Sequence, residues 1–157
     1  MGLPDAESQH ATFMARALEH ARLALLHGDV PVGALVVHNG AVLATGHNRR
    51  EADRDPLAHA EILALREAAH ALDRWRLTGC TLYATLEPCP MCAGALVHAR
   101  VDRLVYAAAD PRTGACGSIL DLVRDPRLNH RLDVVSGVLQ AEAAELLKDF
   151  FRGRRAR

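Results

Sequence analysis

The sequence has no excess of charge of either sign. It contains 19 Lys and Arg residues and 19 Asp and Glu residues, so its formal net charge is zero. Such a balance gives no global indication of nucleic-acid binding, although a local basic patch would still permit it. The charge therefore excludes neither a small-molecule substrate nor an RNA substrate.

The sequence also lacks the long apolar runs of membrane and secreted proteins. No stretch approaches the ~18 consecutive apolar residues that a membrane span needs. The opening segment, MGLPDAESQH, lacks the basic region and apolar run of a secretory signal. We therefore expect a cytoplasmic protein that has no membrane partner.

Cysteine is scarce, and its positions do not have the spacing of a small disulfide scaffold. A chain of 157 residues can form one domain of ordinary size but not two with good cores. Half of the residues are hydrophobic, so a substantial core is available. We expect residues 1–157 to form a single domain with reduced cysteines. The four cysteines are Cys80, Cys89, Cys92 and Cys116.

Apolar periodicity predicts helices that alternate with strands. Asn39-Gly40 is a strong hairpin signal between the first two strands. Alternation of this kind predicts an α/β fold, with a mixed sheet because the first two strands form a hairpin. Residues 48–56 and 110–130 are predicted loops, the second with one helical turn at 118–123. The predicted helices are 7–27, 58–71, 90–99 and 140–151, and the predicted strands are 31–38, 41–47, 80–86, 101–109 and 132–138.

Cys89 and Cys92 form a Cys-x-x-Cys pair at the predicted start of a helix. A spacing of three lets both thiols face one point, and a helix N-terminus favours the thiolate that binds metal. A redox pair and two packed thiols are the alternatives. Cys-Pro-Met-Cys lacks a thioredoxin-like context, but the pair alone does not decide between metal binding and packing.

His59 and Glu61 open another predicted helix, 30 positions before the first of these cysteines. Alone, His59 could be a core histidine and Glu61 a first-turn helix acid. Together, His-Ala-Glu and Pro-Cys-x-x-Cys match the signature of zinc nucleobase deaminases. Three protein ligands would leave the fourth zinc position for water, with Glu61 as the proton-transfer group. The sequence does not decide whether Cys116 is a fourth ligand, which would close the metal site to water. Cys80 is expected to pack in the core.

Longer segments extend the similarity over almost the whole chain. On these residues the chain resembles the bacterial tRNA-specific adenosine deaminases, which convert the wobble adenosine of an arginine tRNA to inosine. The zinc-binding motifs are shared with guanine and cytosine deaminases, whereas the motifs "TGACGS", "NHR" and "DFFR" distinguish the tRNA enzymes from them. The matching segments are "VPVGALVV" (30–37), "HN" (47–48), "DPLAHAEILALR" (55–66), "LYATLEPCPMCAGALVHAR" (82–100), "DPRTGACGSILDL" (110–122), "NHRLDVVSGVL" (129–139) and "LLKDFFR" (146–152).

The resemblance implies a three-layer α/β/α cytidine-deaminase-like fold around a central five-stranded mixed sheet. It implies one zinc ion per subunit on His59, Cys89 and Cys92, with Glu61 as proton shuttle, and a homodimer that helps to form the RNA surface. Two departures, Leu57 for threonine and Ala143 for cysteine, concern only local packing.

The same resemblance implies the substrate contacts. Asn48 would contact the target nucleoside, and backbone near Ala60 and Pro88 would frame the pocket. Each anticodon-loop contact also has an ordinary structural explanation, such as a turn, a strand cap or core packing, which we would prefer without the resemblance. These contacts would fall on Asp110, Arg112, Asn129, Phe150 and Arg152.

The chain end, residues 148–157, contains five basic residues, one acidic residue and two adjacent phenylalanines. Basic and aromatic side chains suit a single-stranded loop through phosphate attraction and base stacking. A solvated, frayed terminus is the alternative.

Three other functions compete with tRNA deamination: a guanine or cytosine deaminase, a zinc-stabilised binding module without turnover, and a redox Cys-x-x-Cys protein.

Overall fold

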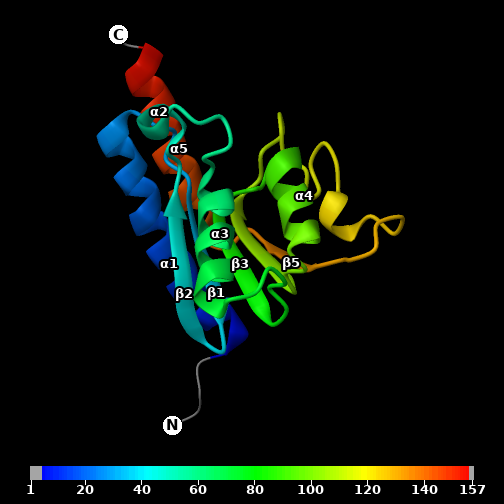
Figure 1. Cartoon of the computed structure of the whole chain (residues 1–157). Helices are drawn as coiled ribbons and strands as arrows, with labels where there is room; N and C mark the ends of the chain where they lie inside the picture. Colours follow the sequence, from blue (N-terminus) through cyan, green and yellow to red (C-terminus); the bar gives the residue numbers. More distant parts are fainter. Residues whose placement is uncertain (1–4, 156–157) are drawn as a thin grey trace.

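The computed structural model describes residues 5–155, apart from the side chain of Arg155. Within this range, five strands form one mixed sheet in the order β2-β1-β3-β4-β5 (Figure 1). β1 is antiparallel to both β2 and β3, whereas β4 is parallel to both β3 and β5. The strands are β1 (Gly33–His38), β2 (Ala41–His47), β3 (Cys80–Leu86), β4 (Arg103–Ala108) and β5 (Asp133–Ser136).

Helices cover both faces of this sheet and so form three layers. α1 and α5 pack on one face, and α3 and α4 on the other (Figure 1). The predicted α/β class, with a five-stranded mixed sheet flanked by helices, is confirmed. The helical segments are α1 (Ala6–Ala24), η1 (Leu25–His27), α2 (Arg50–Asp53), α3 (Ala60–Leu72), α4 (Pro90–His98), η2 (Leu122–Arg124) and α5 (Gln140–Arg155).

Two apolar cores follow from the alternation of side chains along the strands. In β1, Ala34 and Val36 pack in the core under α3 and α4, and Leu35 and Val37 pack in the core under α1 and α5. Both faces of the central strands are therefore buried, which explains why their sequences read as continuous apolar runs.

The sheet topology gathers the starts of α3 and α4 at one edge. Leu86 pairs with Ala108 near the ends of the parallel strands β3 and β4, so both strands end on the same side, as predicted. A Cβ atom on Gly46 in β2 would collide with the backbone oxygen of Ala60. Glycine at this position therefore lets the first turn of α3 pack directly against β2, and this contact fixes the side chains that open the helix.

The structure differs from the sequence prediction in two loops. Residues 48–56 contain the short helix α2, because the buried carboxylate of Asp29 accepts hydrogen bonds from the N–H groups of Glu51 (2.8 Å) and Ala52 (3.2 Å). In the loop 110–130, the helical turn is η2 (Leu122–Arg124) rather than 118–123, because Cys116 and Asp121 form a β-bridge instead.

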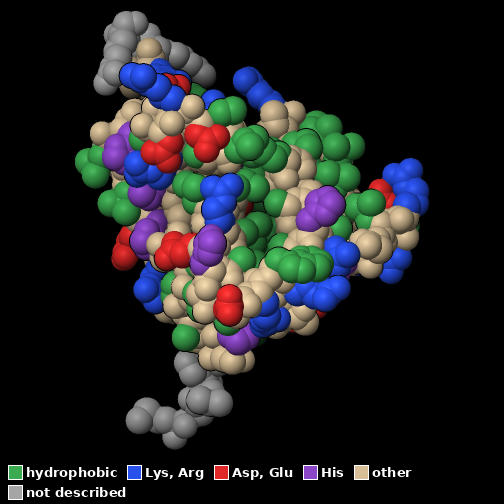
Figure 2. Space-filling view, in the orientation of Figure 1, with side chains coloured by type: hydrophobic (Ala, Val, Ile, Leu, Met, Phe, Trp, Pro, Cys, Tyr) green, Lys and Arg blue, Asp and Glu red, His purple; other side chains and the backbone are tan. Residues whose placement is uncertain are grey.

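In the described part of the chain, no helix is both long and apolar enough to cross a bilayer. Acidic and basic side chains are interspersed on the face seen in Figure 2, and basic ones gather near the end of α5. The last helix continues beyond the predicted residue 151 to Arg155, but Arg157 of the predicted basic end lies outside the described residues.

Candidate metal centre and active-site pocket

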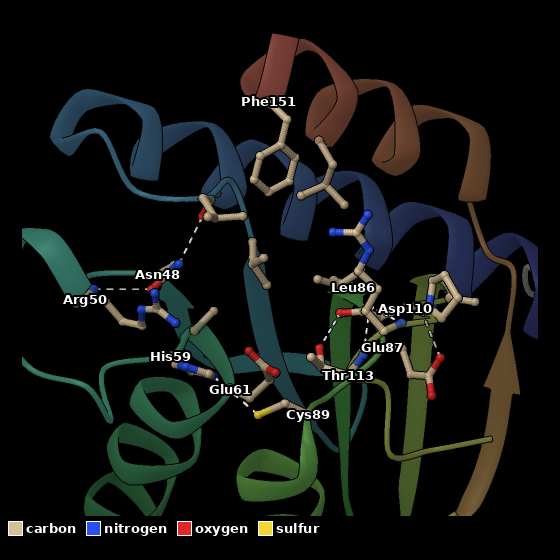
Figure 3. Close-up of a pocket in the computed structure, with 17 residues that line it drawn as sticks. Asn48, Arg50, His59, Glu61, Leu86, Glu87, Cys89, Asp110, Thr113 and Phe151 are labelled. Carbon is tan, nitrogen blue, oxygen red and sulfur yellow. Dashed lines mark hydrogen bonds between the residues drawn. The ribbon is translucent and has the colours of Figure 1, made fainter. Parts of the chain in front are cut away.

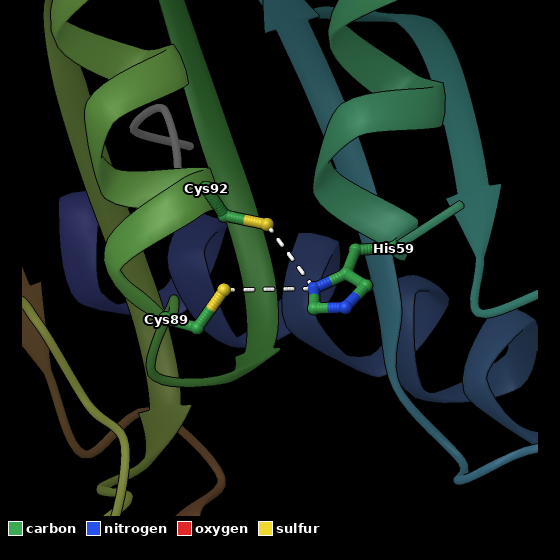
Figure 4. Close-up of side chains that lie close together, drawn as sticks. All are labelled: His59, Cys89 and Cys92. Atoms are coloured by element: carbon green, nitrogen blue, oxygen red, sulfur yellow. Dashed lines mark hydrogen bonds between the residues drawn. The ribbon is translucent and has the colours of Figure 1, made fainter. Parts of the chain in front are cut away.

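His59, Cys89 and Cys92 converge between the N-termini of α3 and α4 (Figure 4). His59 and Cys89 occupy the N-cap positions of their helices, where neither side chain caps the backbone. The His59 Nδ1 atom lies 3.6 Å from the Cys89 Sγ atom and 3.4 Å from the Cys92 Sγ atom. All three potential ligand atoms lie within 4.8 Å of one another.

This donor set fits zinc, which takes imidazole nitrogen and thiolate sulfur in four-coordinate sites. Hydrogen bonding from the Cys92 thiol, and secondarily from His59, lowers the pKa of the Cys89 thiol to about 4. The same hydrogen bond raises the pKa of the Cys92 thiol, because this thiol keeps the shared proton. A thiolate at Cys89 is the form that binds a metal ion.

The other two cysteines lie outside this group in the described part of the chain. Cys116 is buried, its Sγ atom lies 3.9 Å from the backbone oxygen of Pro88, and burial raises the pKa of its thiol. Cys80 is buried in the core under α3 and α4, at the start of β3. Three protein ligands leave one coordination position for water, as catalytic zinc sites do.

Glu61 lies beside this group in the first turn of α3 and is 4% exposed. Burial raises the pKa of its carboxyl group, while its own backbone N–H and the charge of His59 act in the opposite direction. A carboxyl group whose pKa is raised toward neutrality is suited to exchanging protons with a substrate.

His59, Glu61 and Cys89 form the floor of a cavity of about 550 Å³ (Figure 3). Asn48 in the β2–α2 connection and Arg50 at the start of α2 supply one wall, and the segment 109–113 supplies the opposite wall. α5 contributes Leu147 and Phe151 at the mouth. We call this cavity the active-site pocket, and its lining residues are Val30, Val32, Asn48, Arg50, His59, Ala60, Glu61, Leu86, Glu87, Cys89, Ala109, Asp110, Pro111, Arg112, Thr113, Leu147 and Phe151.

Comparison with known proteins decides the family. A model of the MafB19-like deaminase family matches residues 8–155. The chain is 48% identical to the tRNA-specific adenosine deaminase of Bacillus subtilis, over 92% of this chain and 90% of that protein. It is 47% identical to the one of Haemophilus influenzae, over 90% of this chain and 83% of that protein. The chain belongs to the tRNA-specific adenosine deaminase family.

Solved structures agree with this assignment. A structure from work on A-to-I editing by tRNA:A34 deaminases superposes with a TM-score of 0.84 at 46% identity, covering 87% of this chain and 99% of that chain. A guanine deaminase from Nitrosomonas europaea superposes with a TM-score of 0.77 at 29% identity, covering 96% and 86% of the two chains. The resemblance and the cytidine-deaminase-like fold predicted from the sequence are therefore confirmed.

Two predicted contact residues of this deaminase family member have well-defined positions in the pocket walls. Asn48 is 7% exposed; its amide donates to the Val30 oxygen (3.2 Å) and accepts from the Arg50 N–H (3.2 Å). Asp110 accepts hydrogen bonds from the N–H groups of Arg112 (3.0 Å) and Thr113 (3.2 Å). These bonds hold the side chains in place before any substrate binds.

Of the remaining predicted contacts, Arg112 lies in a wall of the pocket and Ala60 in its floor, whereas the others lie outside the lining. Pro88 is buried and accepts a hydrogen bond from the Ala115 N–H (2.9 Å). Asn129 is exposed in the loop before β5. Arg152 forms ion pairs with Glu145 (3.7 Å) and Asp149 (3.6 Å).

Sequence reasoning placed the aromatic contact at Phe150, whereas the structure places Phe151 in the pocket lining. Phe150 packs edge-on against Phe151, with ring centroids 5.2 Å apart, and the Arg154 guanidinium lies 5.0 Å from the Phe150 ring centroid. Phe151 remains 42% exposed. Adjacent positions on a helix differ by about 100° in direction, so the sequence motif alone did not determine which ring faces the pocket.

Sequence reasoning also missed Glu87, a buried carboxylate in the pocket wall. Burial would raise its pKa, but hydrogen bonds from Ser118 and from the N–H groups of Asp110 and Cys116 lower it. The available signal was an acidic residue directly before Pro-Cys-x-x-Cys, after a strand that reads as fully buried. An acid in such a place needs several hydrogen-bond donors.

Proposed function

We propose that this protein catalyses the hydrolytic deamination of adenosine to inosine at the wobble position of tRNA, with the arginine tRNA anticodon loop as substrate and ammonia as the second product. The observation that carries the proposal is the position of Glu61. Its buried carboxyl group lies beside a metal-binding triad on the floor of a pocket large enough for a nucleoside. The family relatives named as tRNA-specific adenosine deaminases supply the substrate class.

We propose that His59, Cys89 and Cys92 hold one zinc ion per chain. Zinc at such a site lowers the pKa of water to near neutrality, which is the chemistry that it would supply. The ligands come from two helix N-termini, whose dipoles favour the thiolates that zinc requires.

In the proposed reaction, Glu61 moves the protons. Its carboxylate takes a proton from the water that attacks C6 of adenine and delivers it to N1. It then carries the remaining hydroxyl proton to the C6 amine, which leaves as ammonia, while C6 keeps the oxygen. The product carries a hydrogen on N1 and a C6 carbonyl, which is inosine. Burial protects the carboxyl group from exchange with bulk water during these transfers.

The pocket walls suit a nucleotide that has been extruded from a single-stranded loop. An anticodon loop is unpaired, so extrusion costs only some unstacking. Asn48 is fixed by two hydrogen bonds at one wall, where it can contact the nucleoside. Phe151 at the mouth offers a ring on which a neighbouring base can stack.

The decisive test is incubation of the zinc-loaded protein with arginine tRNA transcripts, followed by sequencing. We expect adenosine to be read as guanosine at the wobble position, with release of one ammonia per inosine. A guanine deaminase is the second candidate, because the structure also superposes on one. Ammonia release from guanine or cytosine, without change in the tRNA, would favour that candidate. Binding of tRNA without any product would instead indicate a binding module.

Arg50 offers a free positive charge for the RNA backbone. It lines the pocket, and no ion pair holds its side chain within the described residues. Its neighbour Arg49 is instead bound by Asp53, with the NH2–Oδ1 distance at 2.8 Å. Arg50→Gln is expected to weaken binding of an anticodon stem-loop about fivefold and to reduce the slope of log affinity against log salt by about one.

The matched control for this prediction is Arg49→Gln, which removes a guanidinium already neutralised by Asp53. Filter binding from low to moderate salt should show an unchanged slope for this variant. Equal losses in the two variants would mean that Arg50 contributes only to the general charge of the surface.

We also propose that the protein works in the cytoplasm as a homodimer, which the resemblance implies. Large apolar side chains that are exposed in the single chain support the dimer, among them Leu57 (53% exposed) and Ile119 (60%). Light scattering on the purified protein should give twice the mass of one chain.

A further inference from the structure

We propose that Glu87 is a positioning residue for substrate recognition, which ties the loop 110–118 to the metal-binding end of β3. Glu87 directly follows β3 and stands two residues before Cys89. Its side chain is 2% exposed. The loop that it holds carries Asp110 and Arg112, two of the anticodon-loop contacts that the resemblance implies. For its activity measurements, this inference rests on the proposed function.

The Glu87 carboxylate accepts hydrogen bonds from donors at both ends of this loop. The Oε1 atom accepts from the N–H of Asp110 (3.0 Å) and the hydroxyl of Ser118 (2.5 Å). The Oε2 atom accepts from the N–H groups of Cys116 (3.0 Å) and Ser118 (3.1 Å). One carboxylate thus closes a turn of the chain whose ends are separated by eight positions in the sequence.

The loop is shaped to wrap around this carboxylate. A Cβ atom on Gly114 would collide with the carboxyl group of Glu87 and would lie 2.5 Å from the backbone oxygen of Asp110. The Ala115 N–H also donates to the oxygen of Pro88 (2.9 Å), the residue between Glu87 and Cys89. Both a backbone hydrogen bond and the side-chain hydrogen bonds of Glu87 therefore join the loop to the segment that follows β3.

A neutral isostere cannot replace the carboxylate in this position. Three of its four partners are backbone N–H groups, which only donate. In Glu87→Gln, the amide nitrogen would face at least one of these donors whichever way the side chain is turned. A buried N–H without an acceptor costs about 1–3 kcal/mol, so the loop is expected to open.

The position of the loop matters because Pro111, Arg112 and Thr113 form one wall of the active-site pocket, opposite Asn48 (Figure 3). Glu87 fixes the distance between this wall and the floor at His59 and Glu61. Its loss should therefore weaken the binding of RNA more than it slows the chemistry at the floor.

The first test measures the loop itself, without RNA. Trypsin cleaves after exposed arginines in open segments, and Arg112 is exposed. In the zinc-loaded protein, Glu87→Gln is expected to raise the rate of cleavage between Arg112 and Thr113 about tenfold, because local opening governs such cleavage. Mass spectrometry identifies the fragments. Ser118→Ala removes the hydroxyl bond but not the carboxylate, so it should give a smaller increase of about twofold.

The matched control is Asp29→Asn. Asp29 is an equally buried carboxylate that binds two backbone N–H groups, but on the α2 side of the pocket. Cleavage after Arg112 should stay unchanged in this variant. If neither Glu87→Gln nor Ser118→Ala accelerates cleavage, or if Asp29→Asn accelerates it equally, Glu87 does not hold the loop specifically.

The second test measures deamination of an anticodon stem-loop. Glu87→Gln is expected to keep its zinc, to raise KM about tenfold and to change kcat by less than about threefold. Arg112→Gln should raise KM in the wild-type background but add little in the Glu87→Gln background, since the loop is already displaced. Additive effects of the two substitutions on KM, or a fall in kcat with zinc loss and unchanged KM, would contradict the positioning role. Either result would show that Glu87 only stabilises the protein. If the loop opens as expected but even the wild type edits no tRNA, the proposed function fails and the role of Glu87 in the loop stands.

Discussion

Replacing Glu61 by glutamine is expected to lower the rate of inosine formation by about 10³-fold, the middle of the range for loss of a general acid–base group. Glutamine keeps the size of the side chain but cannot take a proton from water or return one to N1. Because Glu61 is not one of the three proposed ligands, the zinc content should remain at one per chain. Glu61→Ala should behave in the same way.

The measurements that check this are single-turnover deamination of an anticodon stem-loop and metal analysis of the same sample. Glu67, in the same helix α3 but outside the pocket lining, offers a matched control. Glu67→Gln should deaminate at the wild-type rate. A Glu61→Gln variant that made inosine at a comparable rate would show that another group moves the protons.

Removing one of the proposed metal ligands is expected to have an equally large effect by a different route. Cys89→Ser replaces a thiolate with a hydroxyl group, which is a poor ligand for zinc at neutral pH. We expect loss of bound zinc and a fall in deamination to the level of the uncatalysed control. In the wild-type protein, a strong chelator should abolish activity, and added zinc should restore it.

Cys80 provides the matched control among the cysteines. It is also buried, but it lies at the opposite end of β3 from the metal centre. Cys80→Ala should keep one zinc per chain, although it leaves a small gap in the core. Zinc retained by Cys89→Ser, or lost equally from Cys80→Ala, would contradict the proposed ligand set. X-ray absorption with two sulfur ligands on the metal would support the set, and three would indicate that Cys116 joins it.

Most of the fold was predictable because its signals are local. The hairpin follows from Asn39-Gly40, and the parallel strands follow from buried apolar runs separated by a helix. The helix α2 was missed because its N–H groups are satisfied by Asp29, more than twenty positions earlier in the chain. A partner at such a distance leaves no pattern in the segment 50–53 itself.

The candidate site was predictable to the same extent. The metal-binding triad could be predicted because its spacing is specific, and the structure brings its three side chains together. The role of Glu87 depends on backbone N–H groups that lie 23 to 31 positions away, and backbone groups carry no sequence signature. The choice between Phe150 and Phe151 depends on how α5 is rotated against the sheet, which packing decides.

The pocket has a floor from the starts of α3 and α4, whereas its walls come from the β2–α2 connection, the loop 110–118 and α5. This division separates two tasks that evolution and engineering can then change independently. Residues that recognise a substrate can be exchanged on the walls without moving the groups that perform the chemistry. Libraries that seek new substrates for this enzyme should therefore randomise wall positions such as Arg50, Arg112 and Phe151, and keep the floor constant.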